Sequence, residues 1–455
     1  MAQQAPTMQI DNLLAQVKVL GSSLNVADRA KVQKSLLDAL SHVETPYEHM
    51  LRLSGSLACI RFGADIGLFK ALVESQEPLT CSYLGEKLNA NANILGRILR
   101  LLASARLVKQ TGLDTFTAEK ITQELAAQAM ESGAHLLFDI HNRTYQALPD
   151  YLCENKSKDV DNMHNGIFQK AFSTDLSCYE YLVHNPKLQG FMQDAMKLNQ
   201  TEGDWLSVLP VEDEIKRWQA SDPDRVLFVD IGGGMGHQCI RLRGKYPDIP
   251  GRVVLQDMPI TVERIPKPMP HGIEAMPYNF EEPQPIKNAK FYYTRNVLHG
   301  LTDSASIAAL KNVAAAMGTE SLLVIDDLII PDEGACTQAC QLDFVMMASI
   351  AGKKRTRDQW YKLLEAAGFE ILQILTYSWP LQDSLIIAMP FKRDITKEDK
   401  RKYNEYKCKR NSQFLRSAFM KLNDKMGVKS HYNKIKRNAI CASLTLRSIL
   451  FRRSV

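Results

Sequence analysis

The chain has 455 residues, a length that is enough for two or three domains with buried cores. Of these residues 45% are hydrophobic and 24% are charged, and there is no run of 18 apolar residues that would indicate a membrane-spanning helix. Its nine cysteines form no CxxC pair, which argues against a disulfide framework or a zinc site and is typical of reduced thiols in the cytosol. The net charge of +5 combines a basic tail of +14 from Lys392 onward with a remainder of −9, and this acidic body argues against nucleic-acid binding.

The N-terminal segment predicts helices without a targeting signal. Its first residues, MAQQAPTMQIDNLL, lack the basic and apolar regions of a secretory signal. Residues 9–40 have helical periodicity with a break at Gly21–Ser23, and either Asn25 or Asp28 is placed to cap the second helix. Residues 46–75 predict further helix that is apolar on most sides.

Residues 81–119 follow the pattern of a winged helix. CSYLGEKL is a short helix, ILGRILRLLASARLV is a second one after a turn, and VKQTGLDTFTAEK resembles a β-hairpin wing. A DNA-binding winged helix needs a basic recognition helix, but this one has only Arg97, Arg100 and Arg106 among many leucines and isoleucines. The apolar excess favours burial, either in the domain's own core or against a second subunit.

The rest of the body changes from helices to alternating elements. Residues 119–205 predict helices interrupted by YLCENKSKDVDNMHNG, and Ser221–Arg225 is a polar link. From Val226 to near Pro390, apolar strands alternate with helices, which predicts a parallel, doubly wound sheet. The predicted strands are VLFVDIGG, RVVLQDMP, AKFYYTRNVL, SLLVIDDLII, EILQILTYSW and SLIIAMP. The lysine-rich tail is typical of a solvated or partly disordered appendage, with a role at anionic surfaces as the alternative.

One motif points to a nucleoside ligand. In VLFVDIGGGMGHQCI an apolar strand ends in Asp230 and leads through a glycine-rich turn into a helix, so that backbone N–H groups can approach a ligand closely. A second strand ends in Asp257, 21 residues beyond Gly236, where a carboxylate can accept both hydroxyls of a ribose. The spacing is not GxGxxG, which disfavours a dinucleotide such as NAD.

Taken together, FVDIGGGMGH, VVLQDMP, FYYTRNVLHG, LLVIDDLIIPDEG and GKKRTRDQW resemble the fungal and plant O-methyltransferases that depend on S-adenosylmethionine (SAM). The resemblance covers residues 10–390 and implies a homodimer. It implies a helical, winged-helix dimerisation domain at 1–125 and a helical connector lining the substrate pocket at 126–220. A Rossmann-like SAM-binding α/β domain follows at 221–391, and a basic tail occupies 392–455.

The resemblance also assigns the cofactor site. Gly232, Gly234 and Asp257 match the family's cofactor positions. Where the family usually has an aspartate that reads the adenine amine, this chain has Asn279. The residues expected to bind SAM are Asp230, Gly232, Gly234, Asp257, Asn279, Phe280 and Arg295.

The catalytic positions depart from the family pattern. The resemblance places the family's base at His299 and one of its two orienting acids at Asp327. The Asp-Trp pair that usually follows the histidine is Gly300 and Leu301 here, and the second orienting acid is replaced by Lys354. In its place a lysine donates hydrogen bonds and, if close, lowers the pKa of the histidine. The alternative interpretations are an ordinary strand-end residue for His299 and a solvent-facing lysine for Lys354.

These departures leave two reactions open. Methyl transfer to a hydroxyl needs a base, and His299 with Asp327 would supply one. Alternatively, Lys354 and His299 polarise a substrate carbonyl without removing a proton. A branch of the family, the fungal pericyclases of leporin-pathway type, matches the second description, and there a histidine of the helical part can contribute. His135 and His141 are the candidates, with an ordinary helix residue as the alternative interpretation of each.

The sequence therefore predicts a cytoplasmic, homodimeric enzyme that binds SAM and a small, largely apolar natural product. We favour, narrowly, a SAM-dependent pericyclase acting on a polyketide-derived pyridone-like substrate. O-methyl transfer to a phenolic or enolic hydroxyl is the alternative, followed by a cofactor-binding regulator without catalysis. We expect no metal, no nucleic acid and no membrane span.

Overall fold

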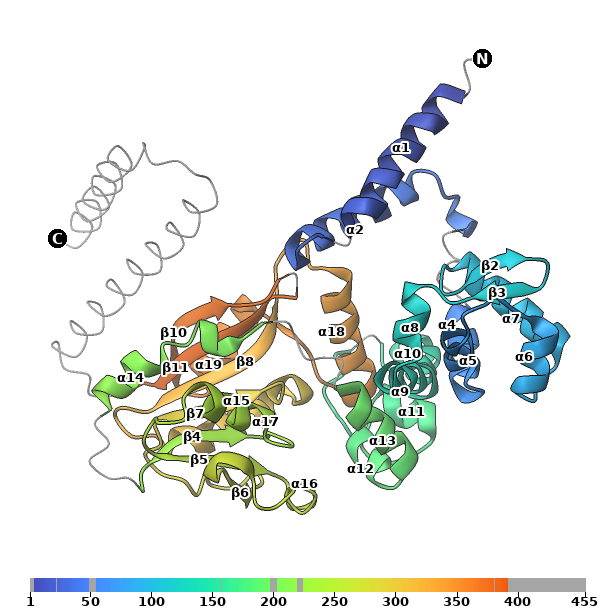
Figure 1. Ribbon diagram of the computed structural model, residues 1–455. Coiled ribbons are helices and arrows are strands. Elements are labelled where there is room, and N and C mark those ends of the chain that lie inside the picture. Colours follow the sequence, from blue (N-terminus) through green and yellow to red (C-terminus); the bar gives the residue numbers. More distant parts are fainter. Residues whose placement is uncertain are drawn as a thin grey trace, which may run out of the picture. The chain divides into compact units, whose positions relative to one another are not determined.

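The fold is described from a computed structural model of the chain (Figure 1). It describes residues 4–21, 23–48, 55–156, 158–196, 203–218, 224–379 and 381–391. The chain up to Pro390 forms one compact unit. The predicted basic tail and most of the predicted link Ser221–Arg225 lie outside the described residues. Within the described ranges, no helix is both long and apolar enough to cross a bilayer.

The chain begins with helices. They are α1 (Gln4–Gly21), α2 (Val26–Ser41), α4 (Ser56–Asp65) and α5 (Leu68–Glu74). The predicted break after Gly21 separates α1 from α2, and Asn25 caps α2 by accepting a hydrogen bond from the backbone N–H of Asp28 at 2.9 Å. Gly67 separates α4 from α5 and has a φ of 72°, a left-handed conformation that favours glycine.

The predicted winged helix is confirmed. It consists of β1 (Leu79–Thr80), α6 (Cys81–Lys87), α7 (Ala92–Ser104), β2 (Lys109–Gly112) and β3 (Thr115–Thr117), with strand order β1-β3-β2. Leu95, Leu99 and Leu102 of α7 are fully buried in one cluster with Leu68 and Phe69 of α5. The leucines of the predicted helix therefore form the core of this small domain.

Short helices connect this domain to the sheet. They are α8 (Lys120–Leu125), α9 (Gln128–Leu136), the π-helix η1 (Leu137–His141), α10 (Asn142–Glu154), α11 (Ile167–Phe172), α12 (Cys178–Val183), α13 (Pro186–Ala195), η3 (Trp205–Ser207) and α14 (Val211–Arg217). The predicted interruption starting at Tyr151 begins too early, because α10 continues to Glu154. The helix ends where Asn155 donates a side-chain hydrogen bond to the carbonyl of Tyr151 at 2.9 Å.

The central sheet is mixed, not fully parallel as predicted. Its strands are β4 (Val226–Ile231), β5 (Arg252–Asp257), β6 (Glu274–Pro277), β7 (Phe291–Arg295), β8 (Leu322–Ile330), β9 (Arg355–Thr356), β10 (Phe369–Thr376) and β11 (Asp383–Pro390). The order is β10-β11-β8-β7-β4-β5-β6, with β9 beside β8. β11 runs antiparallel to both β8 and β10. The connection from Tyr377 to Gln382 is too short for a parallel crossover, so the last two strands form a hairpin.

His299 does not lie at the end of a strand, as FYYTRNVL suggested. β7 ends at Arg295 because Asn296 has a φ of 54° and turns the chain out of the extended conformation. His299 instead lies in the 3-10 turn η5 (Leu298–Gly300), just before α17 (Asp303–Ala314).

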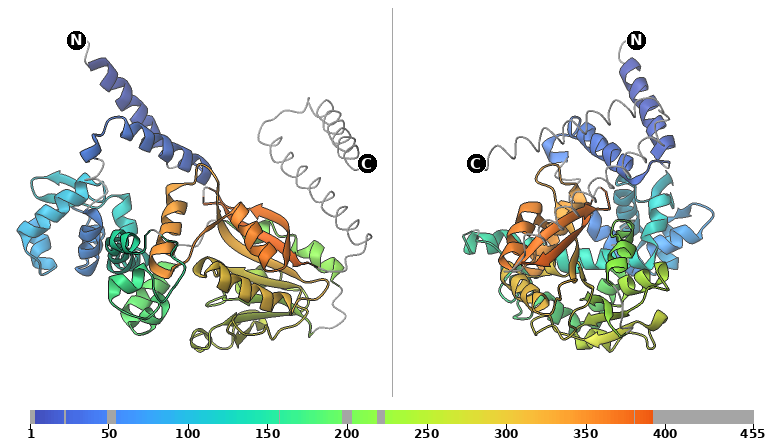
Figure 2. Two further views of the ribbon diagram at one scale, coloured as in Figure 1. Left: turned by 180° about the vertical axis from the view of Figure 1, so that it is seen from behind. Right: turned by 90° about the vertical axis from the view of Figure 1, so that its left-hand side faces the viewer.

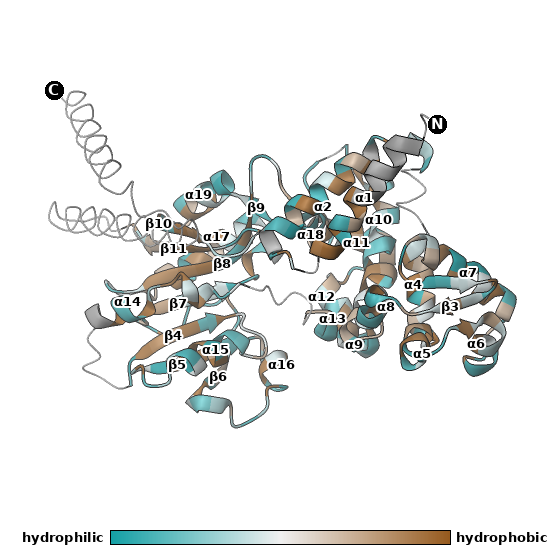
Figure 3. Cartoon of the chain, turned by 45° about the horizontal axis from the view of Figure 1, so that its top comes forward, coloured by the Kyte–Doolittle hydropathy of each residue, from teal (hydrophilic) through white to brown (hydrophobic). Residues whose placement is uncertain are grey.

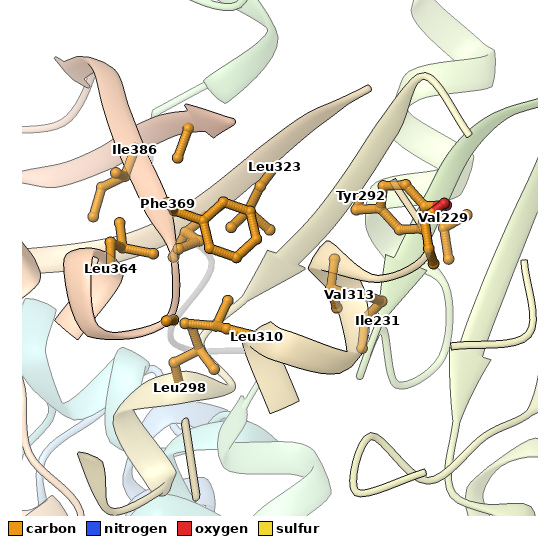
Figure 4. Close-up of a cluster of buried hydrophobic side chains, with 14 of the residues drawn as sticks. Val229, Ile231, Tyr292, Leu298, Leu310, Val313, Leu323, Leu364, Phe369 and Ile386 are labelled. Carbon is orange, nitrogen blue, oxygen red and sulfur yellow. The ribbon is translucent and has the colours of Figure 1, made fainter. Parts of the chain in front are cut away.

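Helices cover both faces of the sheet. α17 and α19 (Arg357–Ala366) pack on one face through residues such as Leu310, Val313 and Leu364 (Figure 4). α15 (His237–Lys245) and α16 (Pro259–Val262) pack on the other face. In Figure 3, strands such as β4 and β8 are coloured as apolar, whereas α15 and α19 carry polar residues. The doubly wound architecture predicted from the sequence is therefore confirmed.

The packing of the cluster in Figure 4 can be tested by its contribution to stability. Leu364 is fully buried, so Leu364→Ala should lower the free energy of unfolding by about 2–5 kcal/mol, because it leaves a cavity. The next residue, Glu365, is exposed, and Glu365→Ala should change the free energy of unfolding by less than about 0.5 kcal/mol. Urea denaturation followed by tryptophan fluorescence measures both. Equal losses in the two variants would contradict the packing described here.

Candidate active site

The turn that carries His299 is held by the segment leading into β9. The buried guanidinium of Arg355 donates from Nη1 to the carbonyl of Leu298 at 2.7 Å and from Nη2 to that of Leu301 at 3.0 Å. The backbone N–H of Lys353 donates to the carbonyl of His299 at 2.8 Å. Gly352 packs so closely against the same backbone that a Cβ would not fit. The position of His299 is therefore fixed from several sides.

Lys354 points into this site, and only 5% of its side chain is exposed. Its Nζ lies 2.8 Å from Oδ1 of Asp327, 2.5 Å from Nδ1 of His299 and 3.3 Å from Oδ1 of Asn296. An ammonium group has three donors, and these three acceptors satisfy them. The sequence left the direction of Lys354 open, and the structure turns it away from solvent.

These contacts set the protonation of His299. Burial lowers the pKa of His299, the charge of Lys354 lowers it further, and Asp327 opposes both. Because the ammonium donates to Nδ1, that nitrogen carries a lone pair and the proton of the neutral ring sits on Nε2. Nε2 has no hydrogen-bond partner among the described residues. In this arrangement Nε2 of the neutral ring carries an N–H donor and not a lone pair.

Asp327 supplies the negative charge of the cluster. Its Oδ1 accepts from Lys354 and from the backbone N–H of Leu328 at 2.8 Å, and it lies 3.3 Å from Nδ1 of His299. Burial raises the pKa of Asp327, but the charge of Lys354 and the hydrogen bonds to the carboxylate outweigh burial and hold that pKa well below its usual range. The carboxyl group is therefore ionised at neutral pH.

The two histidines of the helical part have different surroundings. His141 ends the π-helix η1, and its Nδ1 lies 2.8 Å from Oγ of Ser349, near the end of α18 (Thr337–Ile350). Burial lowers the pKa of His141 to about 4, so its ring is neutral. His135 stacks on Phe191 with ring centroids 4.0 Å apart. It also pairs with Asp139, and these contacts do not connect it with the His299 cluster.

α18 links the helical part to the sheet. It contacts α10, α11, α12 and η1 on one side and β8 and η5 on the other. Figure 2 shows this orange helix from behind, between the teal and green helices and the sheet. Ser349 bonds to His141, and the next residue, Ile350, lies against Gly300. α18 therefore contacts both the helix that carries His141 and the turn that carries His299.

The glycine-rich loop has the shape of a ligand cradle. Gly232, Gly234 and Gly236 have φ values of 71°, 58° and 82°, which favour glycine, and a Cβ on Gly234 would point into open space. Asp257 holds the loop by accepting from the backbone N–H of Gly234 at 2.8 Å. Asp230 is fully buried, and its Oδ1 has no hydrogen-bond partner among the described residues. Burial raises the pKa of Asp230 to about 7. An orphaned acceptor beside an open cradle fits a cationic or hydrogen-bond-donating ligand.

The other predicted cofactor residues have internal contacts. Asn279 accepts from the backbone N–H of Glu281 at 3.1 Å and so shapes the turn after β6, and its amide NH₂ has no acceptor among the described residues. Phe280 packs against the core cluster of Figure 4. Arg295 pairs with Asp326 at 3.3 Å inside the sheet.

Sequence reasoning missed Asn296 and Ser349. Asn296 completes the contacts of Lys354, and Ser349 orients His141. Ser349 belongs to no quoted motif, and Asn296 lies within FYYTRNVLHG but has no family role there. Only the approach of α18 and the left-handed turn give these two residues their contacts. Within the described ranges, no group of three or more metal-ligating side chains is placed to hold an ion.

Family models match both parts of the chain. A model of the O-methyltransferase domain matches residues 145–370, and a model of the O-methyltransferase dimerisation domain matches residues 49–128. The O-methyltransferase dpfgI of Gibberella zeae is 91% identical over 415 residues, which cover 91% of this chain and all of that protein.

Two further relatives are also named as O-methyltransferases. The O-methyltransferase lepI of Aspergillus flavus is 36% identical over 376 residues, covering 82% of this chain and 96% of that protein. The demethylsterigmatocystin 6-O-methyltransferase of Aspergillus parasiticus is 36% identical over 386 residues, covering 84% of this chain and 98% of that protein.

LepI structures match with a TM-score of 0.78 at 35% identity and cover 85% of this chain and 100% of the LepI chain. One contains SAM, and another, of a LepI variant in which a cysteine is replaced by alanine, contains SAH and a substrate analogue. A third solved chain with the same scores is described as a pericyclic reaction enzyme.

The tautomer of His299 can be tested by ¹⁵N NMR of histidine-labelled protein. We expect the wild-type ring to carry its proton on Nε2. In Lys354→Met the ammonium is gone, so Asp327 should accept from Nδ1–H and the tautomer should switch. The pKa of His299 should rise, because a charge that lowers it is removed while Asp327 stays.

Lys353→Met is the matched control, because the side chain of Lys353 pairs with Asp303 and not with His299. A wild-type ring protonated on Nδ1, or a pKa that does not rise in Lys354→Met, would refute the assignment.

Proposed function

We propose that this chain, which belongs to the O-methyltransferase family, is a SAM-dependent pericyclase that cyclises a polyketide-derived, pyridone-like natural product without transferring the methyl group. The contact between Lys354 Nζ and His299 Nδ1 carries this proposal. A general base needs a lone pair facing the substrate, and this contact places a proton on Nε2 instead. His299 is thereby suited to hold a substrate oxygen and poorly suited to deprotonate one.

The cluster acts as a fixed electrostatic clamp. The N–H of His299, backed by the buried ammonium of Lys354, stabilises negative charge that develops on a pyridone oxygen. His141, neutral and held by Ser349, is a second polar group on the helical side of the site. Because these groups are fixed before the substrate arrives, they need little reorganisation during the reaction.

The proposed reaction consumes no co-reactant. In a 4-hydroxy-2-pyridone with a 1-hydroxyalkyl side chain at C3, the ring hydroxyl proton and the side-chain hydroxide leave together as water. A quinone methide remains, and its cycloaddition with a diene in the side chain converts π bonds into new σ bonds without changing composition. Donors that hold the pyridone oxygens favour both steps.

SAM fits the cradle formed by the glycine-rich loop. Gly234 leaves room for its approach, Asp257 at the end of β5 is placed to accept its ribose hydroxyls, and the orphaned carboxyl of Asp230 lies beneath the loop. We assign Asn279 and Phe280 to its adenine side and Arg295 to the support of the loop region. Bound SAM supplies a methyl-bearing sulfonium cation.

We also propose that the enzyme is a homodimer. Residues 49–128 match a dimerisation domain, and α7 exposes Ile94 and Leu101. Apolar side chains that remain exposed on the folded domain are suited to burial by a second copy.

O-methyl transfer to a phenolic or enolic hydroxyl is the second candidate. It is favoured by the names of the relatives at 91% and 36% identity, and by the pairing of His299 with Asp327 at 3.3 Å. For this reaction Lys354 must release Nδ1 so that Asp327 can orient the ring and Nε2 can take the substrate proton.

The mass of the product separates the two reactions. We expect purified protein, SAM and a synthetic 3-(1-hydroxyalkyl)-4-hydroxy-2-pyridone with a diene side chain to give a product lighter by one water, with SAM unconsumed. Mass spectrometry of the product and of the cofactor measures both. A product heavier by one methyl group, together with S-adenosylhomocysteine, would overturn the proposal.

Two substitutions at His299 distinguish a donor from a base. His299→Ala removes the N–H and should lower kcat/KM about 100-fold, whereas His299→Gln keeps an amide donor and should lower it only about 10-fold. Steady-state kinetics on the same pyridone measures the difference. A general base would make the two variants equally poor, because an amide cannot accept the proton.

A further inference from the structure

Gly300, next to His299, leaves space that a side chain of the helical part occupies. A Cβ built on Gly300 would lie 3.2 Å from the hydroxyl of Tyr179 and 3.4 Å from Cδ1 of Ile350. Gly300 is buried and does not have a left-handed backbone, so its turn does not demand glycine. The missing side chain therefore serves to admit the hydroxyl of Tyr179.

Tyr179 is held in place by its helix. The hydroxyl of Ser177 accepts a hydrogen bond from the backbone N–H of Glu180 at 3.3 Å, and the carboxylate of Glu180 accepts one from the backbone N–H of Ser177 at 2.7 Å. These two hydrogen bonds cap the start of α12. Cys178 and Leu182 are buried in one cluster with Ile140 and Ile350. The helix is thus anchored on the side that faces α18, and Tyr179 projects from an ordered element.

The hydroxyl of Tyr179 is available to a ligand. It makes no hydrogen bond among the described residues, and the residue is 45% exposed although the hydroxyl reaches a buried glycine. Burial of the hydroxyl raises the pKa of Tyr179 to about 12, so the hydroxyl is protonated at neutral pH. It can therefore donate to an oxygen atom that approaches Gly300.

We propose that Tyr179 is a second substrate-contacting donor of this site and that Gly300 is the specificity-determining residue that admits it. The inference rests on the proposed function and narrows the substrate class. A 4-hydroxy-2-pyridone has two oxygens, at C2 and C4, that flank the reacting carbon C3. His299 Nε2–H holds one of them and the hydroxyl of Tyr179 holds the other, so that the ring is oriented by two donors from different parts of the chain.

Tyr179→Phe tests the donor, because it removes only the hydroxyl. We expect kcat/KM for the 3-(1-hydroxyalkyl)-4-hydroxy-2-pyridone to fall about 10- to 100-fold, with SAM affinity by calorimetry and the thermal unfolding midpoint unchanged. Tyr181→Phe is the matched control on the same helix, since its ring packs against Phe168 and Phe172, and it should retain wild-type kinetics. Wild-type kinetics in Tyr179→Phe would overturn the inference.

A double-mutant cycle tests the part played by Gly300. Gly300→Ala displaces the hydroxyl by a few tenths of an ångström and should lower kcat/KM a few-fold. In the Tyr179→Phe background the same change should cost nothing further, because the displaced atom is absent. Losses that simply multiply would refute the pairing of Gly300 with Tyr179.

The product mass keeps this inference separate from the proposed function. If the wild type methylates the pyridone, the pericyclase proposal fails, while a slower Tyr179→Phe still supports the substrate contact. If the wild type dehydrates and cyclises the pyridone but Tyr179→Phe is unaffected, only the inference about Tyr179 fails.

Discussion

The buried ammonium of Lys354 is the constraint around which the site is organised. A charge removed from water is costly unless every hydrogen-bonding atom is paired, and here three acceptors surround it. Asn296 reaches it only because its backbone turns left-handed after β7. The carboxylate of Asp343 accepts from the backbone N–H of Lys354 at 2.7 Å, which fixes the start of its side chain.

Under the proposed function, this constraint reverses the role that the family resemblance implies for His299. With a carboxylate in the position of Lys354, a neutral imidazole would donate from Nδ1 and present a lone pair from Nε2. The ammonium inverts that polarity without moving the ring. The scaffold beneath it, Arg355 and the turn it holds, does not depend on which of the two reactions is catalysed. One substitution can therefore change the chemistry while the fold stays the same.

The sequence predicted the fold where local signals exist. Apolar runs located β4, β5 and β8, and Asn25 or Asp28 marked a helix start, which the structure assigns to Asn25. Strand direction is not encoded in periodicity, so the antiparallel β11 was missed. The apolar run through Leu298 hid the end of β7, which depends on the backbone of Asn296. The family pattern located His299 and Lys354, but their contact, and the approach of Tyr179 to Gly300, arise only from tertiary packing.

α18 contacts both the helical part of the chain and the sheet, and the two parts contribute different groups. The loops after the sheet strands supply the polar groups of the His299 cluster and the cradle for the cofactor. The helices that precede the sheet carry His141, which contacts Ser349 of α18, and Tyr179, whose hydroxyl lies against Gly300. Under the proposed function, the sheet side stabilises a substrate oxygen and the helical side selects the substrate that presents it. The two sides meet along α18 and the turn η5.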